Sequence, residues 1–158
     1  AINYAEKVLN NNKIEANVEA DAKIIIARSA FKTEDFSTSE EYFKVVGLTA
    51  TGKLKAETLY YDAFFKNEFK EHKESNKVIQ QLIADYSAYK YWGVKSYILM
   101  AKNHYALNDA YQATYILENI IKNFSQFEDV ITEAEKELQS IKNKEAKTNE
   151  SVNTKNQN

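Results

Sequence analysis

The chain has 158 residues, of which 44% are hydrophobic and 13% aromatic, and its formal net charge is −2. This length is enough for one domain with a buried core, and the near-neutral charge provides no basic footprint for nucleic acid. The absence of cysteine excludes disulfides and thiolate metal sites. No apolar run approaches the ~18–20 residues that span a bilayer, and no signal peptide is recognisable.

Apolar residues recur at helical spacing along most of the chain, and the sequence has three glycines and no proline. This pattern predicts an all-α protein of about eight helices joined by short turns. Three asparagines at 10–12 interrupt the pattern, and Ser37 with Glu40 has the spacing of a capping box. The expected helices cover residues 2–9, 18–31, 38–46, 53–69, 72–86, 91–107, 110–124 and 127–144.

A register of small and apolar residues occurs three times. In each set a second small residue follows the first after twelve positions, and apolar residues follow four and seven positions further on. The sets are Ala27–Ser39–Phe43–Val46, Ala63–Ser75–Ile79–Leu82 and Ala101–Ala113–Leu117–Ile120. Self-similarity at a fixed period is typical of helical repeat arrays, with the small residues at the helix crossings. An irregular helical bundle, which also places alanine at crossings, is the less favoured alternative.

The register divides the chain into segments. Residues 13–50, 51–88 and 89–125 are predicted to form three helix-turn-helix repeats, followed by a closing helix at 126–145 and a disordered polar tail at 146–158. Residues 1–12 are predicted to be the second helix of an earlier repeat, because Val8 precedes Ala27 by the same interval that separates Leu82 from Ala101. We therefore expect the chain to be the C-terminal part of a longer array.

The third set resembles the tetratricopeptide repeat most closely, in the stretch 91–101 and in the turn Leu107-Asn108-Asp109 that precedes Ala113. The chain departs from that pattern at the turn, where Glu34 and Asn108 replace a usual glycine, and the closing proline is absent throughout. The long repeats are similar to those of bacterial envelope proteins, such as the outer-membrane assembly lipoprotein and the TolA-binding coordinator, and to large repeat proteins of Bacteroidetes.

This resemblance covers about residues 1–125 and implies a right-handed α-solenoid of antiparallel helix pairs. It further implies a non-enzymatic scaffold that binds a peptide or helix of a partner protein, in the periplasm or at the outer membrane, with the cytoplasm left open. The alternative is a structural or self-association module that supports a larger repeat protein, with a dimer formed through the N-terminal helix.

In proteins of this family the first helix of each pair lines a concave groove. Residues on the corresponding side of the three first helices are therefore the candidate binding residues. Aromatic residues and arginine are frequent anchors of interfaces, although the aromatic members could instead only pack against neighbouring helices. The candidates are Ile24, Arg28, Phe31, Glu57, Tyr60, Phe64, Lys95, Ile98, Lys102 and Tyr105.

No catalytic, cofactor or metal site is predicted. His72 and His104 have no second histidine or cysteine at ligand spacing. Glu133, Glu135 and Glu137 lie on a helix whose charged face we expect to be solvated, whereas acid–base catalysis needs a partly desolvated pocket. The three scattered glycines cannot form a phosphate-binding loop. The expected partner is therefore a protein, and neither nucleic acid nor a membrane span is expected.

Overall fold

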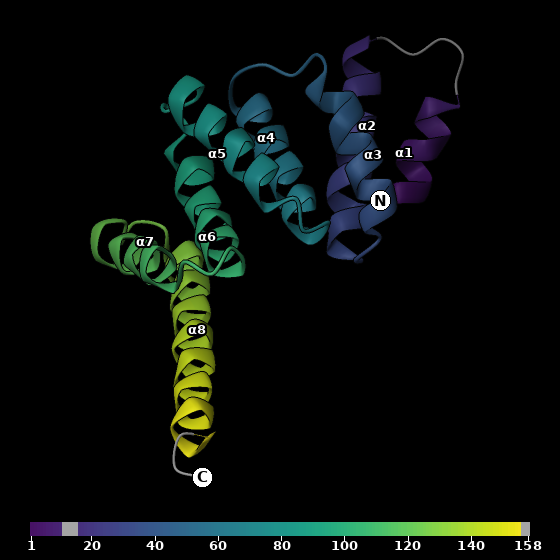
Figure 1. The fold of residues 1–158 in the computed structure, drawn as a ribbon. Helices are drawn as coiled ribbons and strands as arrows, with labels where there is room; N and C mark the ends of the chain where they lie inside the picture. The colour runs from purple at the N-terminus through teal and green to yellow at the C-terminus, as the bar shows by residue number, and fades with distance from the viewer. Residues whose placement is uncertain (11–15, 156–158) are drawn as a thin grey trace.

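The computed structural model describes residues 1–10 and 16–155, and this part of the chain consists of eight α-helices and no strand (Figure 1). The prediction of an all-α chain is thus confirmed for the described residues. The start of the first predicted repeat, at residue 13, lies outside them. The helices are α1 (Ile2–Leu9), α2 (Ala16–Lys32), α3 (Phe36–Gly47), α4 (Gly52–Glu68), α5 (His72–Asp85), α6 (Lys90–Ala106), α7 (Ala110–Asn123) and α8 (Glu128–Lys155).

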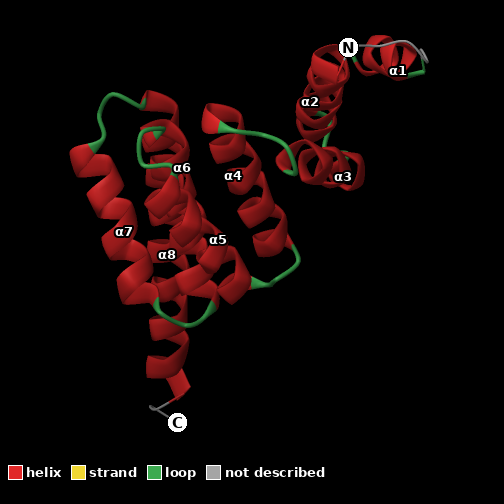
Figure 2. Cartoon of the chain, turned by 90° about the horizontal axis from the view of Figure 1, so that it is seen from above, coloured by secondary structure: helices red, strands yellow, loops and turns green. Residues whose placement is uncertain are grey.

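Each helix packs against the next one along the chain, and two further contacts join α4 to α6 and α6 to α8. Helices α1–α3 form a group at one end of the molecule, and α8 extends away from the opposite end (Figures 1 and 2). The apolar core is correspondingly divided into clusters that follow one another along the chain. Each of the three larger clusters joins three successive helices, so local packing positions each helix pair.

The small residues of the register lie at the helix crossings, where they are fully buried. The Ser39 hydroxyl donates a hydrogen bond to the carbonyl oxygen of Ala27 at 3.0 Å, and the Ser75 hydroxyl donates to that of Ala63 at 2.8 Å. Each bond ties the second helix of a pair to the first helix. In the third pair Ala113 is equally buried but has no hydroxyl to donate. The residues expected to fill the space beyond the crossings are also buried: Phe43, Val46, Ile79, Leu82, Leu117 and Ile120.

The turns that follow α2, α4 and α6 share one backbone conformation. Glu34, Lys70 and Asn108 have φ values of 60°, 64° and 66°, in the left-handed region that favours glycine. In all three turns the next residue donates its backbone N–H to a carbonyl five positions earlier, as in a Schellman motif. The turn is therefore a second feature that recurs with the intervals of the small-residue register.

Helices α4 to α7 agree with the sequence predictions to within one residue at each end. The predicted cap of α3 is wrong. This helix begins at Phe36, so Ser37 already lies in the first turn, and the N-cap is Asp35, whose side chain accepts a hydrogen bond from the backbone N–H of Thr38 at 3.2 Å.

The predicted disordered tail covers residues 146–158, and the structure describes residues 146–155 of it as helix. Helix α8 continues to Lys155, well beyond Ile141, which is the last fully buried residue among those of α8 whose burial the structure describes. This segment has no glycine or proline to end the helix, and extending an existing helix requires no new nucleation. Residues 156–158 lie outside the described part of the chain.

Candidate protein-binding face

The ten predicted groove residues lie on α2, α4 and α6, but the structure gives them very different exposure. Ile24 and Ile98 are 6% and 1% exposed and belong to the apolar clusters that hold the helices together. They have almost no exposed surface in this structure, and their place in a groove stays a prediction. Helical spacing alone could not separate the buried edge of this face from its exposed edge, because the neighbouring helix covers one side of it.

Arg28 and Glu57 are brought together from α2 and α4. The Nε and Nη2 atoms of Arg28 donate to the two carboxylate oxygens of Glu57 at 2.7 Å and 2.6 Å, a bidentate pair. The Arg28 side chain is 49% exposed, whereas that of Glu57 is 5% exposed. The hydrogen bond from Glu57 raises the pKa of Arg28. Glu57 is therefore satisfied inside the protein, and the outer edge of Arg28 is the part of the pair open to a partner.

Aromatic rings fill the junction between α2, α3 and α4. The ring centroid of Phe31 lies 5.0 Å from that of Phe64 and 4.8 Å from that of Tyr61. Tyr61 also stacks on Phe43 of α3 with a centroid distance of 3.9 Å. Burial raises the pKa of Tyr61 to about 12, with a further contribution from the charge of Glu57. Phe31 and Phe64 thus pack against neighbouring helices, which is the alternative left open by their sequence pattern.

A second group of rings joins α4 to α6. Tyr60 is buried, and burial raises its pKa well above the ordinary tyrosine value. The Lys95 ammonium lies 5.7 Å from the centroid of the Tyr60 ring, within the range of a cation–π contact. The Trp92 ring lies 5.3 Å from that of Tyr60, and its buried indole N–H has no acceptor within the described residues. The buried Tyr60 ring therefore lies against the Lys95 ammonium, and the Lys95 side chain is 22% exposed.

The third set of predicted residues faces α8. Lys95 pairs with Glu133 and Lys102 with Glu137, each at 3.7 Å. The Tyr105 hydroxyl donates to Glu145 at 3.0 Å. We expected the carboxylates of the last helix on a solvated outer face. Glu133 and Glu137 instead face the lysines of α6, and their side chains are 40% and 21% exposed.

Tyr91 and Asp129 extend this seam between α6 and α8. The Tyr91 hydroxyl donates to Asp129 at 2.7 Å, which lowers the pKa of the Asp129 carboxyl. Burial and this hydrogen bond raise the pKa of Tyr91. Sequence reasoning missed these carboxylates, although the intervals from Tyr91 to Asp129 and from Lys95 to Glu133 are both 38 residues, one repeat length.

Five surface cavities among the described residues lie elsewhere, since none of the ten predicted residues lines them. One of about 290 Å³ lies between α3 and α4, and two more lie beside α6. The face formed by α2, α4, α6 and α8 is thus a seam of rings and ion pairs, and a concave groove along it stays a prediction.

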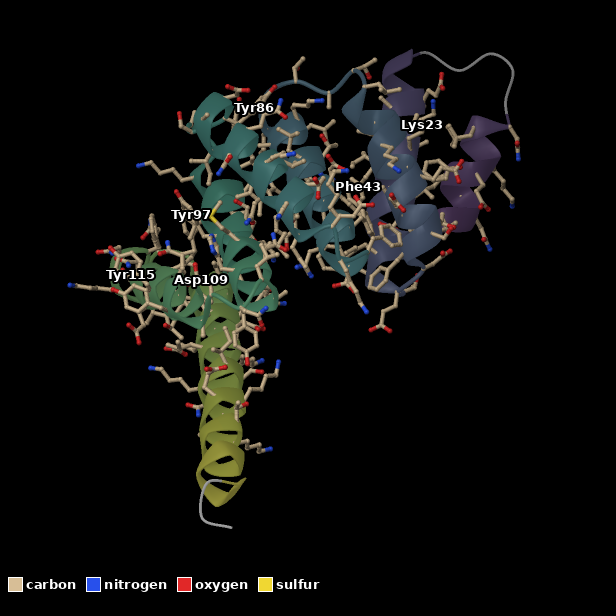
Figure 3. All side chains as sticks on the ribbon, viewed as in Figure 1. Lys23, Phe43, Tyr86, Tyr97, Asp109 and Tyr115 are labelled. Carbon is tan, nitrogen blue, oxygen red and sulfur yellow. The ribbon has the colours of Figure 1, made fainter. Side chains whose placement is uncertain are left out.

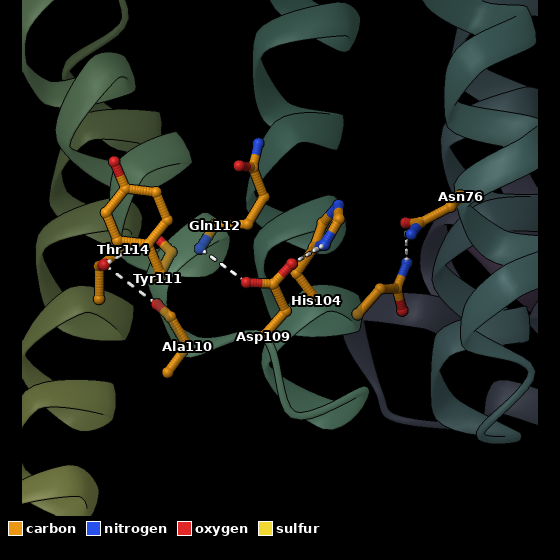
Figure 4. Close-up of polar contacts among 8 residues, drawn as sticks. Asn76, His104, Asp109, Ala110, Tyr111, Gln112 and Thr114 are labelled. Atoms are coloured by element: carbon orange, nitrogen blue, oxygen red, sulfur yellow. Dashed lines mark hydrogen bonds and ion pairs between the residues drawn. The ribbon is translucent and has the colours of Figure 1, made fainter.

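Both histidines stand beside helix N-termini. His72 Nδ1 lies 3.0 Å from the Asn103 side-chain oxygen. His104 Nδ1 lies 3.4 Å from Asp109, which also accepts the backbone N–H of Gln112 at 3.0 Å as the N-cap of α7 (Figure 4). Across the residues that the structure describes, no three His, Asp or Glu side chains are grouped to hold a metal ion. None of the described helices combines the length and apolarity that crossing a membrane requires.

The fold defines the chain as an all-helical protein in which successive helices pack in series. No family model matches the chain, and no curated protein or solved structure is significantly similar to it. Membership of the tetratricopeptide family therefore stays a prediction that rests on the sequence register.

Proposed function

We propose that the chain is a non-enzymatic scaffold of tetratricopeptide-like helix pairs, arranged as a right-handed solenoid, that binds a peptide or helix of a partner protein. The recurring geometry supports this proposal best. The bond from Ser39 to Ala27 is repeated 36 residues later between Ser75 and Ala63, and the left-handed turn recurs at each of three pairs. Helix arrays of this kind present extended surfaces suited to binding other proteins.

The binding surface that we propose is the exposed part of the seam along α2, α4, α6 and α8. It offers the outer edge of Arg28 on α2 and the half-buried Lys102 and Tyr105 on α6. It carries both charge signs, because Lys102 and the half-buried Glu137 lie on it together with the exposed edge of Arg28. A peptide or helix that carries both charge signs would match this surface, and such complementarity favours specificity and rapid association.

A photo-crosslinking amino acid placed at Lys102 tests the surface in the native cell. The matched control carries the same residue at Lys136, which is exposed on α8 away from the ion pairs with α6. We expect a defined protein adduct from position 102 and none from position 136. Equal capture at both positions, or no adduct at position 102, would contradict the proposal.

We further propose, from the resemblance to envelope repeat proteins, that the scaffold acts in the bacterial cell envelope, in the periplasm or at the outer membrane. Fractionation of native cells followed by immunoblotting tests this location. Recovery with the periplasmic or outer-membrane fraction is expected. Recovery in the cytoplasmic fraction alone would remove the envelope from the proposal and leave the protein-binding role in place.

Self-association is a second candidate function, supported by an apolar surface between α1 and α2. A cavity of about 300 Å³ lies there, and Tyr4 and Ile25 on its rim are 79% and 44% exposed. Exposed apolar patches commonly mark interaction sites. Sedimentation equilibrium of the Ile25→Glu variant tests this candidate, with Lys7→Glu on the exposed side of α1 as the control. A dimer that only Ile25→Glu dissociates would favour self-association, and a monomeric wild type would exclude it.

A further inference from the structure

A different face of the molecule carries a groove formed by α5, α6 and α7. Two cavities of about 360 Å³ and 400 Å³ adjoin there, because Tyr97, Asn123 and Phe124 line both of them. Tyr86, Tyr97 and Tyr115 follow one edge of the molecule, away from Phe43 (Figure 3). We refer to these two cavities together as the tyrosine groove. It contains none of the ten residues predicted for the other face.

The rings in the tyrosine groove are spaced apart. Within the described residues, neither Tyr97 nor Phe124 has a ring-to-ring contact, whereas Tyr86 meets only Tyr89 and Tyr115 meets only Tyr111. The groove therefore presents separate aromatic walls with open space between them. Along the other face, by contrast, the rings contact one another and close the space.

The polar groups of the tyrosine groove are nearly all uncharged. Lys90 is its single charged residue, and no ion pair joins Lys90 to any described residue. Asn119 donates one amide N–H to the Tyr115 carbonyl at 2.8 Å, which leaves its second N–H for another acceptor. No hydrogen bond within the described residues involves the Tyr97 hydroxyl. A ligand that fits must be largely uncharged and must supply hydrogen-bond acceptors.

We propose that the tyrosine groove binds a proline-rich peptide in the polyproline II conformation, with an acidic residue of the peptide beside Lys90. Aromatic-lined grooves are a recurrent means of recognising this conformation, which is already ordered before binding. Its proline rings fit between spaced aromatic walls, and its backbone carbonyls have no internal partners and accept hydrogen bonds from hydroxyl and amide groups. The single cation matches one carboxylate at the end of the segment. This proposal goes beyond the scaffold function, since it concerns a second surface.

Fluorescence anisotropy tests the proposal with a labelled peptide of six prolines preceded by one aspartate. The comparison probe has the same length and aspartate but carries glycine and serine in place of proline. We expect the wild-type chain to bind the proline peptide at least tenfold more tightly than the comparison probe. Equal affinity for the two probes would overturn the proposal. Binding of a neutral hexasaccharide at this groove without binding of the proline peptide would overturn it as well.

Two tyrosines on α7 provide a matched pair of variants. Tyr115 lines the groove and is 53% exposed, whereas Tyr111, one turn earlier and 79% exposed, lines neither cavity. Both side chains are accessible, so neither truncation should disturb the fold. We expect Tyr115→Ala to weaken binding of the proline peptide about tenfold, in line with the dominance of aromatic anchors at interfaces. Tyr111→Ala removes only the ring that stacks on Tyr115, so it should weaken binding clearly less. An equal loss in both variants would contradict the assigned groove.

Two further variants separate this site from the other face. Lys90→Gln should weaken binding about threefold and reduce its dependence on salt, because it removes the single cation. Lys102→Gln should leave the affinity for the proline peptide unchanged. If Lys102→Gln lowers the affinity for the proline peptide as strongly as Tyr115→Ala does, the peptide binds at the other face and the proposal for the tyrosine groove fails.

Discussion

Two junctions between neighbouring helix pairs are built differently in this molecule. At the junction between α4/α5 and α6/α7, α6 packs closely against both helices of the preceding pair. At the junction between α2/α3 and α4/α5, α4 packs against α3, but within the described residues its backbone does not approach that of α2. Similar sequence registers therefore lead to a close junction in one place and a more open one in the other.

The close junction is centred on Asn103, a fully buried side chain of α6. Its amide nitrogen donates to Ser75 and Asn76, each at 2.8 Å, and its oxygen lies 2.7 Å from the donor of Asn67 and 3.0 Å from His72 Nδ1. All four hydrogen-bonding positions of the amide are thus occupied. A buried network of this kind is stabilising only when each member is satisfied, so it requires one specific helix arrangement.

The open junction relies on side chains that reach across the gap. Phe31 contacts Tyr61 and Phe64, and the Arg28–Glu57 pair joins α2 to α4. Ring packing tolerates small shifts better than a network of short hydrogen bonds, because dispersion contacts have little directionality. The comparison teaches that a buried amide network, together with rings, holds the close junction, whereas rings and one ion pair bridge the open one.

The largest expected effect is that of Asn103→Ala. This change leaves several buried groups of the close junction without partners, each at a cost of ~1–3 kcal/mol. We therefore expect the free energy of unfolding to fall by about 3 kcal/mol, measured by urea denaturation. Asn143→Ala, on the exposed side of α8, is the control and should be nearly neutral. A loss below about 1 kcal/mol for Asn103→Ala would show that water replaces the network at little cost.

Arg28→Ala should have the next largest effect, at the open junction. Hydrogen bonds to charged groups contribute ~1.5–3 kcal/mol, and the half-exposed guanidinium places this pair near the lower end. We expect the free energy of unfolding to fall by about 2 kcal/mol, because the buried Glu57 carboxylate loses its partner. The double variant with Glu57→Gln should recover part of that loss. Lys32→Ala, one turn further along α2, is the control. Additive effects of the Arg28 and Glu57 changes would contradict the coupling.

The two serines of the register allow a direct comparison of the two halves. Ser39→Ala removes one hydrogen bond and should cost about 1 kcal/mol. Ser75→Ala should cost about 2 kcal/mol, because Asn103 also loses an acceptor. Thermal and urea unfolding measure both, with Ser37→Ala on the exposed side of α3 as a neutral control. Equal losses at the two serines would show that the Asn103 network is energetically separate from the helix crossing.

The smallest expected effects are gains in stability at the left-handed turns. Replacing Lys70 by glycine removes the strain of a side chain at positive φ and should stabilise the fold by about 0.5–1 kcal/mol. Asn108→Gly should raise the free energy of unfolding by less, because asparagine tolerates this conformation better than lysine does. Glu41→Gly, in the interior of α3, is the control and should lose about 1 kcal/mol. A loss at Lys70→Gly would contradict the observed turn conformation.

Several of the sequence predictions followed from periodicity and were confirmed because periodicity is local. Helical spacing located α4 to α7 to within one residue, and the small-residue register located the crossings at Ala27, Ala63 and Ala101. The close junction also had a sequence signal that was not recognised, since Asn67 and Asn103 stand 36 residues apart, like the alanines of the first two sets.

The predicted binding face depended on information that periodicity lacks. Ile24 and Ile98 share a helix side with Arg28 and Lys102, and only the placement of the neighbouring helices decides which of them is covered. The partners of Lys95 and Lys102 on α8 could not be predicted from periodicity either. Ion pairs between exposed charges are weak, so they form where two helices already lie close together and do not determine how those helices pack.

By itself the sequence determined the all-α fold class, the positions of most helices and the small residues at their crossings. These features depend on residues that lie close together in the sequence. Only the tertiary structure decided which side of each helix is covered, how α8 meets α6, and that one junction closes on Asn103 while the other stays open. These features depend on the relative placement of whole helices, which is set by the sum of many weak contacts between distant parts of the chain.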